Sequence, residues 1–335
     1  MQTRILSLFV FASLGCKKTL CSKDLVQIMA IGPPILNPGD TIGIVTLGSP
    51  LDPTVIDARL SFLMGLGFNI VLGDYVYANN GYLAGTDEQR ASDLMRMYED
   101  SNVKAILPTR GGVGVEGILP FLDFYTIVDN PKIISGYSDI TILLNAISQF
   151  TNQITFNSLL LIDFRPDTPE YNFDQFFAAT STYVSPRVIL NPPNMPTYSK
   201  IPGNVTGTLV GGNLTSFVGS LGTPYEIDTK GKIFFLEEVH EPINTVYRYI
   251  VQLKVAGKFD DCIGIIMGEC TRCQEAYGMN YEDLITDVLV PIGKPLLTNI
   301  ASGHGYYKAA LPIGAMVNLN TIDNSLTVLE PTVSL

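Results

Sequence analysis

Tryptophan is absent from this chain of 335 residues, histidine occurs only twice, and basic residues are few, with 21 Lys and Arg against 32 Asp and Glu. The formal net charge of −11 has the wrong sign for a surface that must neutralise phosphates, so we expect no nucleic-acid partner. Charged residues make up only 16% of the chain and hydrophobic residues 46%, which excludes large-scale disorder. The length suits about two folded domains.

Cysteine is scarce and unevenly placed. The odd number of cysteines and their spacing exclude a disulfide framework, so we expect reduced thiols. Two of them form a CxxC pair, but a structural zinc ion needs about four ligands and only one further cysteine lies nearby, so we expect no metal ion. The five residues are Cys16, Cys21, Cys262, Cys270 and Cys273.

The apolar run from Ile5 to Leu14 is too short to cross a bilayer, so no stable membrane span is expected. A basic residue before it and Gly15 and Cys16 after it are similar to a short secretion signal. The alternative is an over-long reading frame that starts at Met29. We interpret residues 1–30 as a leader or a non-native extension, and predict a cytoplasmic location, with export or membrane anchoring as the alternative if residues 1–16 act as a signal.

Apolar, β-branched runs alternate with helical stretches in residues 31–165. The clearest helix is predicted from Asp87 to Tyr98, where Thr86 and Gln89 form a capping box. This alternation predicts a mostly parallel α/β domain, in which ligands bind beyond the carboxyl ends of the strands. The predicted strands are Thr41–Thr46, Asn69–Leu72, Val103–Leu107 and Lys132–Ser135.

Seven prolines interrupt residues 163–202, and we interpret residues 166–203 as an interdomain linker. Residues 204–335 are predicted to form a second, smaller domain that is richer in β-structure. Its predicted strands are Asn204–Val210, Lys232–Leu236, Cys262–Met267, Leu296–Asn299, Gly314–Val317 and Ser325–Leu329.

A serine lies at a sharp turn between a predicted strand and a predicted helix. Ser138 follows the strand that ends at Ser135 and precedes the apolar helix Ile140–Phe150. At such a turn the hydroxyl is presented at the sheet edge, and the helix N-terminus supplies N–H groups for an oxyanion. The alternative is that Ser138 or Asp139 simply caps the helix.

The base for such a serine can only be His240 or His304, because the chain has no other histidine. His304 has a glycine on each side and follows a predicted strand, as catalytic loop residues often do. His240 lies among carboxylates and stays an alternative. Glu237 directly follows the strand Lys232–Leu236, where it could orient an imidazole, although an ordinary surface charge is the competing interpretation.

A glycine-rich turn after the strand Val103–Leu107 matches GxGxxG at Gly112, Gly114 and Gly117. This pattern suggests a dinucleotide site. However, dinucleotide fingerprints usually follow the first strand of the unit, and this turn follows a later one. The same turn could instead donate a backbone N–H to an oxyanion beside Ser138.

Taken together, seven segments in this order resemble the LD-carboxypeptidase family of serine peptidases, which also includes microcin-immunity amidases. The resemblance extends from about Asn37 to Pro312. The segments are PGDTIGIV (38–45), YLAGTDEQRASDL (82–94), RGGVG (110–114), NPKIISGYSDIT (130–141), GGNL (211–214), LEE (236–238) and GHG (303–305).

The resemblance implies a Ser-His-Glu triad, which falls on Ser138, His304 and Glu237, and an oxyanion hole formed by the backbone amides of Asp139 and Gly112. It implies an amidotransferase-like N-terminal domain with a parallel sheet that carries the nucleophile. A smaller β-rich C-terminal domain would then supply Glu and His, so the active site would lie between the domains. No cofactor is implied.

The implied reaction is hydrolysis of the L-to-D peptide bond that releases terminal D-alanine from muropeptide tetrapeptides in peptidoglycan recycling. Arg110 is the candidate for binding the free carboxylate of the substrate. The short interval from Ser138 to Glu237 and the lack of tryptophan favour this reaction over a microcin-immunity-type amidase acting on peptide-nucleotide substrates. A dinucleotide-dependent oxidoreductase and a non-catalytic binding protein on the same fold are two further hypotheses. A homodimer is one assembly that we consider.

Overall fold

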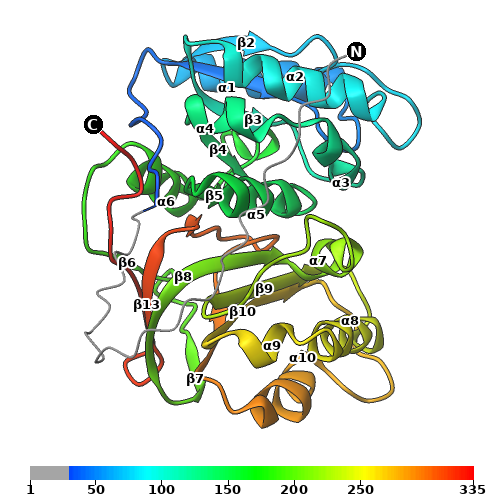
Figure 1. Ribbon diagram of the computed structural model, residues 1–335, viewed down its shortest axis with the longest axis vertical. Helices are drawn as coiled ribbons and strands as arrows, with labels where there is room; N and C mark the ends of the chain where they lie inside the picture. The colour runs from blue at the N-terminus through cyan, green and yellow to red at the C-terminus, as the bar shows by residue number, and fades with distance from the viewer. Residues whose placement is uncertain (1–29) are drawn as a thin grey trace, which may run out of the picture.

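The computed structural model describes residues 30–335, which form two stacked lobes (Figure 1). Each lobe is built around one sheet, and helix α5 (Ile140–Thr151) lies between the two sheets. The mixed α/β class with two domains is therefore confirmed. Within the described range no helix is both long and apolar enough to cross a bilayer. The segment interpreted as a leader lies outside the described residues, apart from residue 30.

The sheet of the first lobe has the strand order β12-β5-β4-β3-β1-β2, and all of its strands except β12 run parallel. The four strands predicted for this part of the chain are confirmed to within about one residue at each end. The sheet contains β1 (Thr41–Val45), β2 (Asn69–Leu72), β3 (Val103–Pro108), β4 (Ile133–Gly136), β5 (Thr155–Asn157) and β12 (Leu311–Ile313).

Helices cover this first sheet. The helix predicted from Asp87 is α2 (Asp87–Glu99), and both hydrogen bonds of the capping box between Thr86 and Gln89 are present. Satisfying these first N–H groups is what starts the helix at this residue. The other helical segments of this lobe are α1 (Pro53–Gly65), α3 (Val115–Ile118), α4 (Phe124–Asp129) and the 3-10 turns Leu119–Phe121 and Leu161–Asp163.

The sheet of the second lobe has the order β6-β14-β13-β8-β9-β10-β11-β7. Its four central neighbours, β8 to β11, are parallel, and the outer strands are antiparallel. The six predicted strands correspond to β8 (Asn204–Asn213), β9 (Ile233–Val239), β10 (Gly264–Thr271), β11 (Leu296–Ile300), β13 (Met316–Asn320) and β14 (Ser325–Val328). The helical segments are α7 (Leu214–Ser220), α8 (Ile243–Val255), α9 (Lys258–Asp261), α10 (Tyr281–Leu284), the π-turn Ile285–Leu289 and the 3-10 turn Val290–Ile292.

The proline-rich segment 166–203 carries structure of its own: helix α6 (Glu170–Thr180), and strands β6 (Arg187–Ile189) and β7 (Tyr198–Ile201), which form opposite edges of the second sheet. The α6 side chain Phe176 packs against Phe164 with ring centroids 5.6 Å apart. The segment therefore belongs to both lobes.

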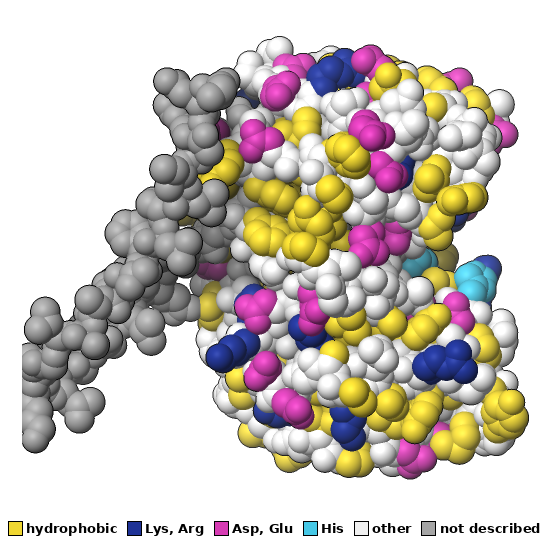
Figure 2. Space-filling model, turned by 45° about the vertical axis from the view of Figure 1, so that its right-hand side comes forward, with side chains coloured by type: hydrophobic (Ala, Val, Ile, Leu, Met, Phe, Trp, Pro, Cys, Tyr) yellow, Lys and Arg dark blue, Asp and Glu magenta, His cyan; other side chains and the backbone are white. Residues whose placement is uncertain are grey.

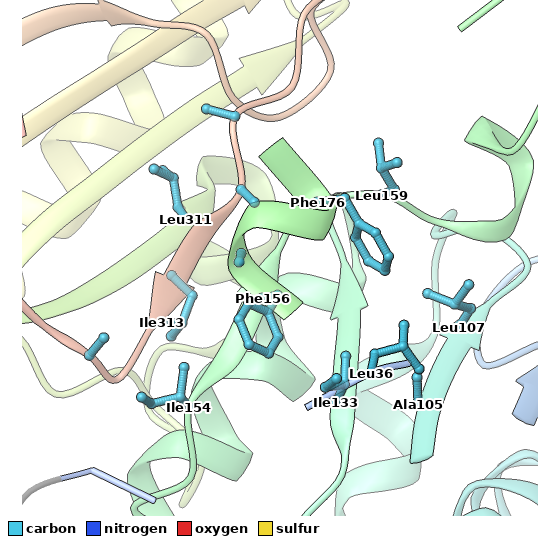
Figure 3. Packing of buried hydrophobic residues seen from close by; sticks show 14 of the residues in the cluster. Leu36, Ala105, Leu107, Ile133, Ile154, Phe156, Leu159, Phe176, Leu311 and Ile313 are labelled. Atoms are coloured by element: carbon cyan, nitrogen blue, oxygen red, sulfur yellow. The ribbon is translucent and has the colours of Figure 1, made fainter. Parts of the chain in front are cut away.

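The largest buried apolar cluster also joins the two lobes (Figure 3). Ile154 and Phe156, on or beside β5, lie next to Leu311 and Ile313 of β12. Burying such a side chain contributes roughly 1.5–3 kcal/mol. Because β12 follows β11 of the second lobe in sequence but pairs with the sheet of the first, this packing holds the two lobes together.

Candidate active site

Ser138 occupies a strained turn between β4 and α5. Its φ of 63° lies in the left-handed region, which costs energy for a residue other than glycine and is typical of functional turns. The Thr141 N–H donates to the Ser138 carbonyl at 2.9 Å, which fixes the turn. No side chain caps α5, so the capping interpretation of Ser138 and Asp139 is wrong. The Asp139 carboxylate instead accepts the Val115 N–H at 2.8 Å.

The glycine-rich turn lies directly against this serine. A Cβ placed on Gly111 would lie 2.9 Å from Ser138 Oγ and 3.1 Å from the Asp139 nitrogen, so only glycine fits here. Gly112, with φ of 97°, is the next residue, and its own Cβ would collide with Ser49. The turn therefore packs closely against the serine and the start of α5. Gly111 is a contact that sequence reasoning did not single out.

Arg90 supports this turn through hydrogen bonds, and it was not identified from the sequence. Its side chain is fully buried and donates to the carbonyls of Gly114 at 2.7 Å, Gly85 at 3.3 Å and Leu47, besides an ion pair with Asp87. Burial lowers the pKa of Arg90, and Asp87 partly offsets this effect. The signal in the sequence was an arginine on the apolar face of an amphipathic helix.

Glu237 and His304 meet in the second lobe. Glu237 Oε2 lies 2.8 Å from His304 Nδ1 and accepts the His304 backbone N–H at 3.2 Å. The carboxylate is only 1% exposed, and Asn213 Nδ2 donates to its other oxygen at 3.2 Å. A Cβ on Gly303, whose φ is 101°, would lie 2.4 Å from Glu237 Cδ. The glycine before His304 is thus what lets the loop close over the carboxylate.

The next residue, Glu238, faces other partners. Its carboxylate accepts the Thr215 N–H at 2.9 Å and the Val239 N–H at 2.8 Å. Burial raises the pKa of Glu238, and the hydrogen bonds from Thr215 lower it. This alternation of adjacent strand residues separates a carboxylate that contacts the imidazole from one that holds the start of α7.

Hydrogen bonds between the lobes connect the helix behind Ser138 to the strands that carry Glu237. Asn145 of α5 donates to the Gly211 carbonyl at 2.9 Å and accepts the Gly211 N–H at 3.0 Å. Thr141 Oγ1 accepts the Asn213 N–H at 3.1 Å, and Asn213 pairs in register with Glu237. Strand β8 therefore fixes the position of the Ser138 turn relative to the Glu237 carboxylate.

Tyr137, the residue before Ser138, provides the contact with the histidine. Its ring meets the His304 ring edge-on with centroids 5.0 Å apart. Figure 2 shows histidine and acidic side chains together at the waist between the two lobes. The structure thus brings the serine turn, His304 and Glu237 to one interface between the domains.

The remaining predicted residues lie around this interface in different settings. His240 is exposed on a loop with φ of 63°, where its backbone N–H donates to the Thr271 carbonyl at 2.9 Å. Arg110 is partly exposed at the start of the glycine turn. Among residues 30–335 no hydrogen bond or ion pair holds its guanidinium.

The dinucleotide interpretation of the glycine turn does not fit the structure. The helix that follows, α3, has only four residues, and its first N–H, that of Val115, is taken by the Asp139 carboxylate. Gly117 faces the Asp87 carboxylate, which a Cβ would approach to 2.8 Å. Two carboxylates therefore stand where a pyrophosphate would need cationic or neutral surroundings.

The expectation of reduced thiols is wrong for one pair, because Cys270 and Cys273 form a disulfide. A tight turn at the end of β10, with Arg272 at φ of 55°, brings their Cα atoms to 5.4 Å. Burial raises the pKa of the free Cys262 to about 11. Cys16 and Cys21 lie outside the described residues. Among residues 30–335 no group of three or more His, Cys, Asp or Glu is arranged to hold a metal ion.

Two family models match this chain, one in each lobe. Residues 42–158 match the LD-carboxypeptidase N-terminal domain, and residues 206–319 match the LD-carboxypeptidase C-terminal domain. A relative from Bacillus subtilis (strain 168), named "Probable murein peptide carboxypeptidase", is 37% identical over 305 residues, which cover 88% of this chain and 93% of the relative.

Two further matches come from the microcin-immunity branch. The Escherichia coli "Microcin C7 self-immunity protein MccF" is 29% identical over 325 residues, covering 87% of this chain and 94% of that protein. The solved structure of MccF in complex with glutamyl sulfamoyl guanosine superposes with a TM-score of 0.85 at 26% identity, covering 91% of this chain and all of that one.

Proposed function

The chain belongs to the LD-carboxypeptidase family, and from this premise we propose that it is a serine carboxypeptidase whose triad is Ser138, His304 and Glu237. The proposed reaction is hydrolysis of the L-to-D peptide bond that releases terminal D-alanine from a muropeptide tetrapeptide. The observation that carries the proposal is the 2.8 Å contact between Glu237 and His304, on a loop packed against the residue before Ser138. The name of the Bacillus subtilis relative supports the substrate class.

In the proposed mechanism Ser138 Oγ attacks the carbonyl carbon and passes its proton to His304 Nε2. Because Nδ1 faces Glu237, the tautomer with a proton on Nδ1 leaves Nε2 free to accept. The C–N bond then breaks, and His304 gives the proton to the departing amine of D-alanine. Water, deprotonated by the same imidazole, hydrolyses the acyl-serine and restores the hydroxyl.

The negative oxygen of each tetrahedral intermediate needs fixed donors. We assign this role to the N–H groups of Asp139, which follows the serine, and of Gly112, which follows the glycine packed against it. The buried guanidinium of Arg90 supports the turn by binding the Gly114 carbonyl. Preorganised donors of this kind are usually the largest single contribution to such catalysis.

A carboxypeptidase must also bind the free carboxylate of its substrate. Arg110 is our candidate, because it begins the turn that faces Ser138 and its guanidinium is not engaged elsewhere within residues 30–335. A guanidinium can bind a carboxylate through two parallel hydrogen bonds.

The second candidate function is a microcin-type amidase, favoured by the similarity to MccF. The absence of tryptophan argues against it, since that side chain is the one best suited to stack on a nucleobase. We therefore place the peptidase first.

The test is a mass-spectrometric assay of the purified protein. A muropeptide tetrapeptide with terminal D-alanine should lose one alanine residue, whereas a glutamyl sulfamoyl nucleotide should stay intact. Ser138→Ala should abolish the loss, and Ser92→Ala, at an exposed serine of α2, should not. Cleavage of the nucleotide alone would favour the amidase, and cleavage of neither substrate by folded protein would overturn the peptidase.

We also propose the domain boundaries 31–165 and 204–335, with 166–203 as the connection. A cytoplasmic location goes with peptidoglycan recycling, whereas the Cys270–Cys273 disulfide favours export, because such bonds persist in oxidising compartments. Thiol alkylation in intact cells, followed by mass spectrometry of this pair, distinguishes the two.

A further inference from the structure

Lys308 is a buried cation that the proposed triad does not include. Its side chain is in the loop after His304, only 7% of the residue is exposed, and Nζ donates to the Gly305 carbonyl at 2.6 Å. The backbone N–H of Lys308 donates to Asn172 Oδ1 at 2.8 Å, and Asn172 Nδ2 donates to the Tyr306 carbonyl at 3.1 Å. The whole loop after the histidine is therefore fixed from α6 and by its own lysine.

The ammonium group also contacts the other lobe. Nζ of Lys308 lies 4.8 Å from the centroid of the Tyr137 ring, a cation–π contact. The same ring meets His304 edge-on, and Tyr137 immediately precedes Ser138. The Lys308 side chain thus contacts Gly305, which follows the proposed base, and Tyr137, which precedes the proposed nucleophile.

The charges around this lysine come from three other elements. Carboxylates of Asp163, at the end of a 3-10 turn, Glu237 of β9 and Glu269 of β10 act on its ammonium, together with the cation Arg165. Asp163 also accepts the Tyr137 hydroxyl at 3.3 Å. Burial lowers the pKa of Lys308, and the carboxylates offset this effect. Glu269 Oε2 is buried without a hydrogen-bond partner in the described chain, and burial raises the pKa of that carboxyl.

This arrangement places the Lys308 ammonium close to the Glu237–His304 pair. Its positive charge repels the positive charge that forms when the imidazole takes a proton. A neutral imidazole is the form that can act as a base.

We propose that Lys308 is a positioning residue of the proposed triad: its ammonium holds the His304 loop to Tyr137, and its charge keeps the imidazole available as a base. The inference rests on the proposed function, because it assumes that His304 acts as the base. The contacts of Lys308 are with Gly305, Asn172 and Tyr137, and we assign it no direct part in the reaction.

The experiment compares Lys308→Met, Lys308→Gln and Lys308→Arg. We expect kcat on the tetrapeptide to fall about 10- to 100-fold in Lys308→Met with a smaller change in KM, the size of a lost charge-assisted contact. In Lys308→Met and Lys308→Gln, the fall of kcat/KM at low pH should begin at a higher pH than in the wild type. The reason is that the imidazolium forms more readily once the neighbouring cation is gone. Lys308→Arg keeps the charge, so its acid limb should stay near that of the wild type.

Lys308→Gln removes the charge but keeps a donor for the Gly305 carbonyl, so it distinguishes the effect of the charge from that of the hydrogen bond. It also replaces Lys308→Met in the comparison if that variant does not fold. Lys254→Met, at an exposed lysine of α8, controls for the change in net charge. Thermal unfolding of every variant separates lost stability from lost positioning.

The rate at which a fluorophosphonate labels Ser138, measured against pH, gives the same profile without any peptide substrate. A folded wild type that is not labelled would overturn the proposed triad. A labelled wild type whose acid limb is unchanged in both Lys308→Met and Lys308→Gln would overturn the role of Lys308 and leave the triad intact.

Discussion

The two histidines differ in their surroundings, since His304 contacts a buried carboxylate and His240 lies exposed on a loop. We expect His304→Ala to lower kcat by about 10⁴- to 10⁶-fold, because the serine loses its proton acceptor and the leaving amine its donor. His240→Ala should keep most of the activity. Steady-state kinetics on the confirmed substrate measures both. Loss of activity in His240→Ala with an active His304→Ala would mean that the base is misassigned.

Scarcity is what made residues of the proposed site predictable. With two histidines and one strand–turn–helix serine, the sequence left few combinations, and Glu237 was singled out because it follows the predicted strand Lys232–Leu236, although the observed strand β9 continues past it to Val239. Arg90, Gly111 and Lys308 could not be found in the same way, because each acts through contacts with residues that are distant in sequence or on another element. The place of Arg90 on the apolar face of its helix was a signal, but the sequence does not show which distant carbonyls the guanidinium contacts.

A buried lysine of the first lobe should leave a signature in the pH dependence of stability. Lys132 is 5% exposed and donates to the carbonyls of Asp100 and Val103, and burial lowers its pKa to about 8. An unfolded lysine keeps its proton to about pH 10.4. The cost of burying the charge is thus fully present below pH 8 and is relieved as pH rises from 8 towards 10.

Relative to Lys132→Met, the free energy of unfolding of the wild type should therefore increase between pH 8 and pH 10. The expected size is on the order of 2 kcal/mol, since each pKa unit corresponds to about 1.4 kcal/mol. Urea unfolding at pH 7, 8.5 and 9.5 measures the difference. A difference that stays constant across this range would show that Lys132 titrates as it does in the unfolded chain.

At the scale of elements, the loop that carries His304 depends on one glycine. Gly303→Ala should lower activity at least about 100-fold, because its Cβ would overlap the Glu237 side chain in addition to the strain of a positive φ. Gly293→Ala is the matched control: its φ is 76°, and its Cβ would meet no atom within 4 Å. Both variants should lose stability from backbone strain, and Gly303→Ala should lose more because of the overlap with Glu237, as thermal unfolding would show; only Gly303→Ala should lose activity. Equal kinetic effects would contradict the role given to this loop.

The predicted strands lie close to the observed ones because turn residues and apolar β-branched runs mark their ends locally. Strand β12 was not predicted, since three apolar residues carry no local signal and its partner, β5, is about 155 residues away. Strands β6 and β7 were not predicted either, because they lie in the proline-rich segment that was interpreted as a linker. Long-range pairing decides such short strands, and local propensity does not.

At the scale of the whole molecule, the glycine turn should not bind dinucleotides. Saturating NAD(H) or NADP(H) should leave the melting temperature unchanged, because carboxylates of Asp139 and Asp87 occupy the positions a pyrophosphate needs. A true ligand at 100 times its dissociation constant would add about 2.7 kcal/mol of stability. Differential scanning fluorimetry measures the shift, and a clear increase would revive the oxidoreductase hypothesis.

The central claim is that two lobes, joined by α5, β8 and the β5–β12 pairing, create one activated serine at their interface. The most direct measurement is reaction of the folded protein with a fluorophosphonate probe, followed by peptide mapping with mass spectrometry. An oxyanion hole and an adjacent base should activate one serine above all others. We predict a single label on Ser138, lost in Ser138→Ala and slowed by orders of magnitude in His304→Ala. Labelling of a different serine, or none in protein that cleaves its substrate, would contradict the account.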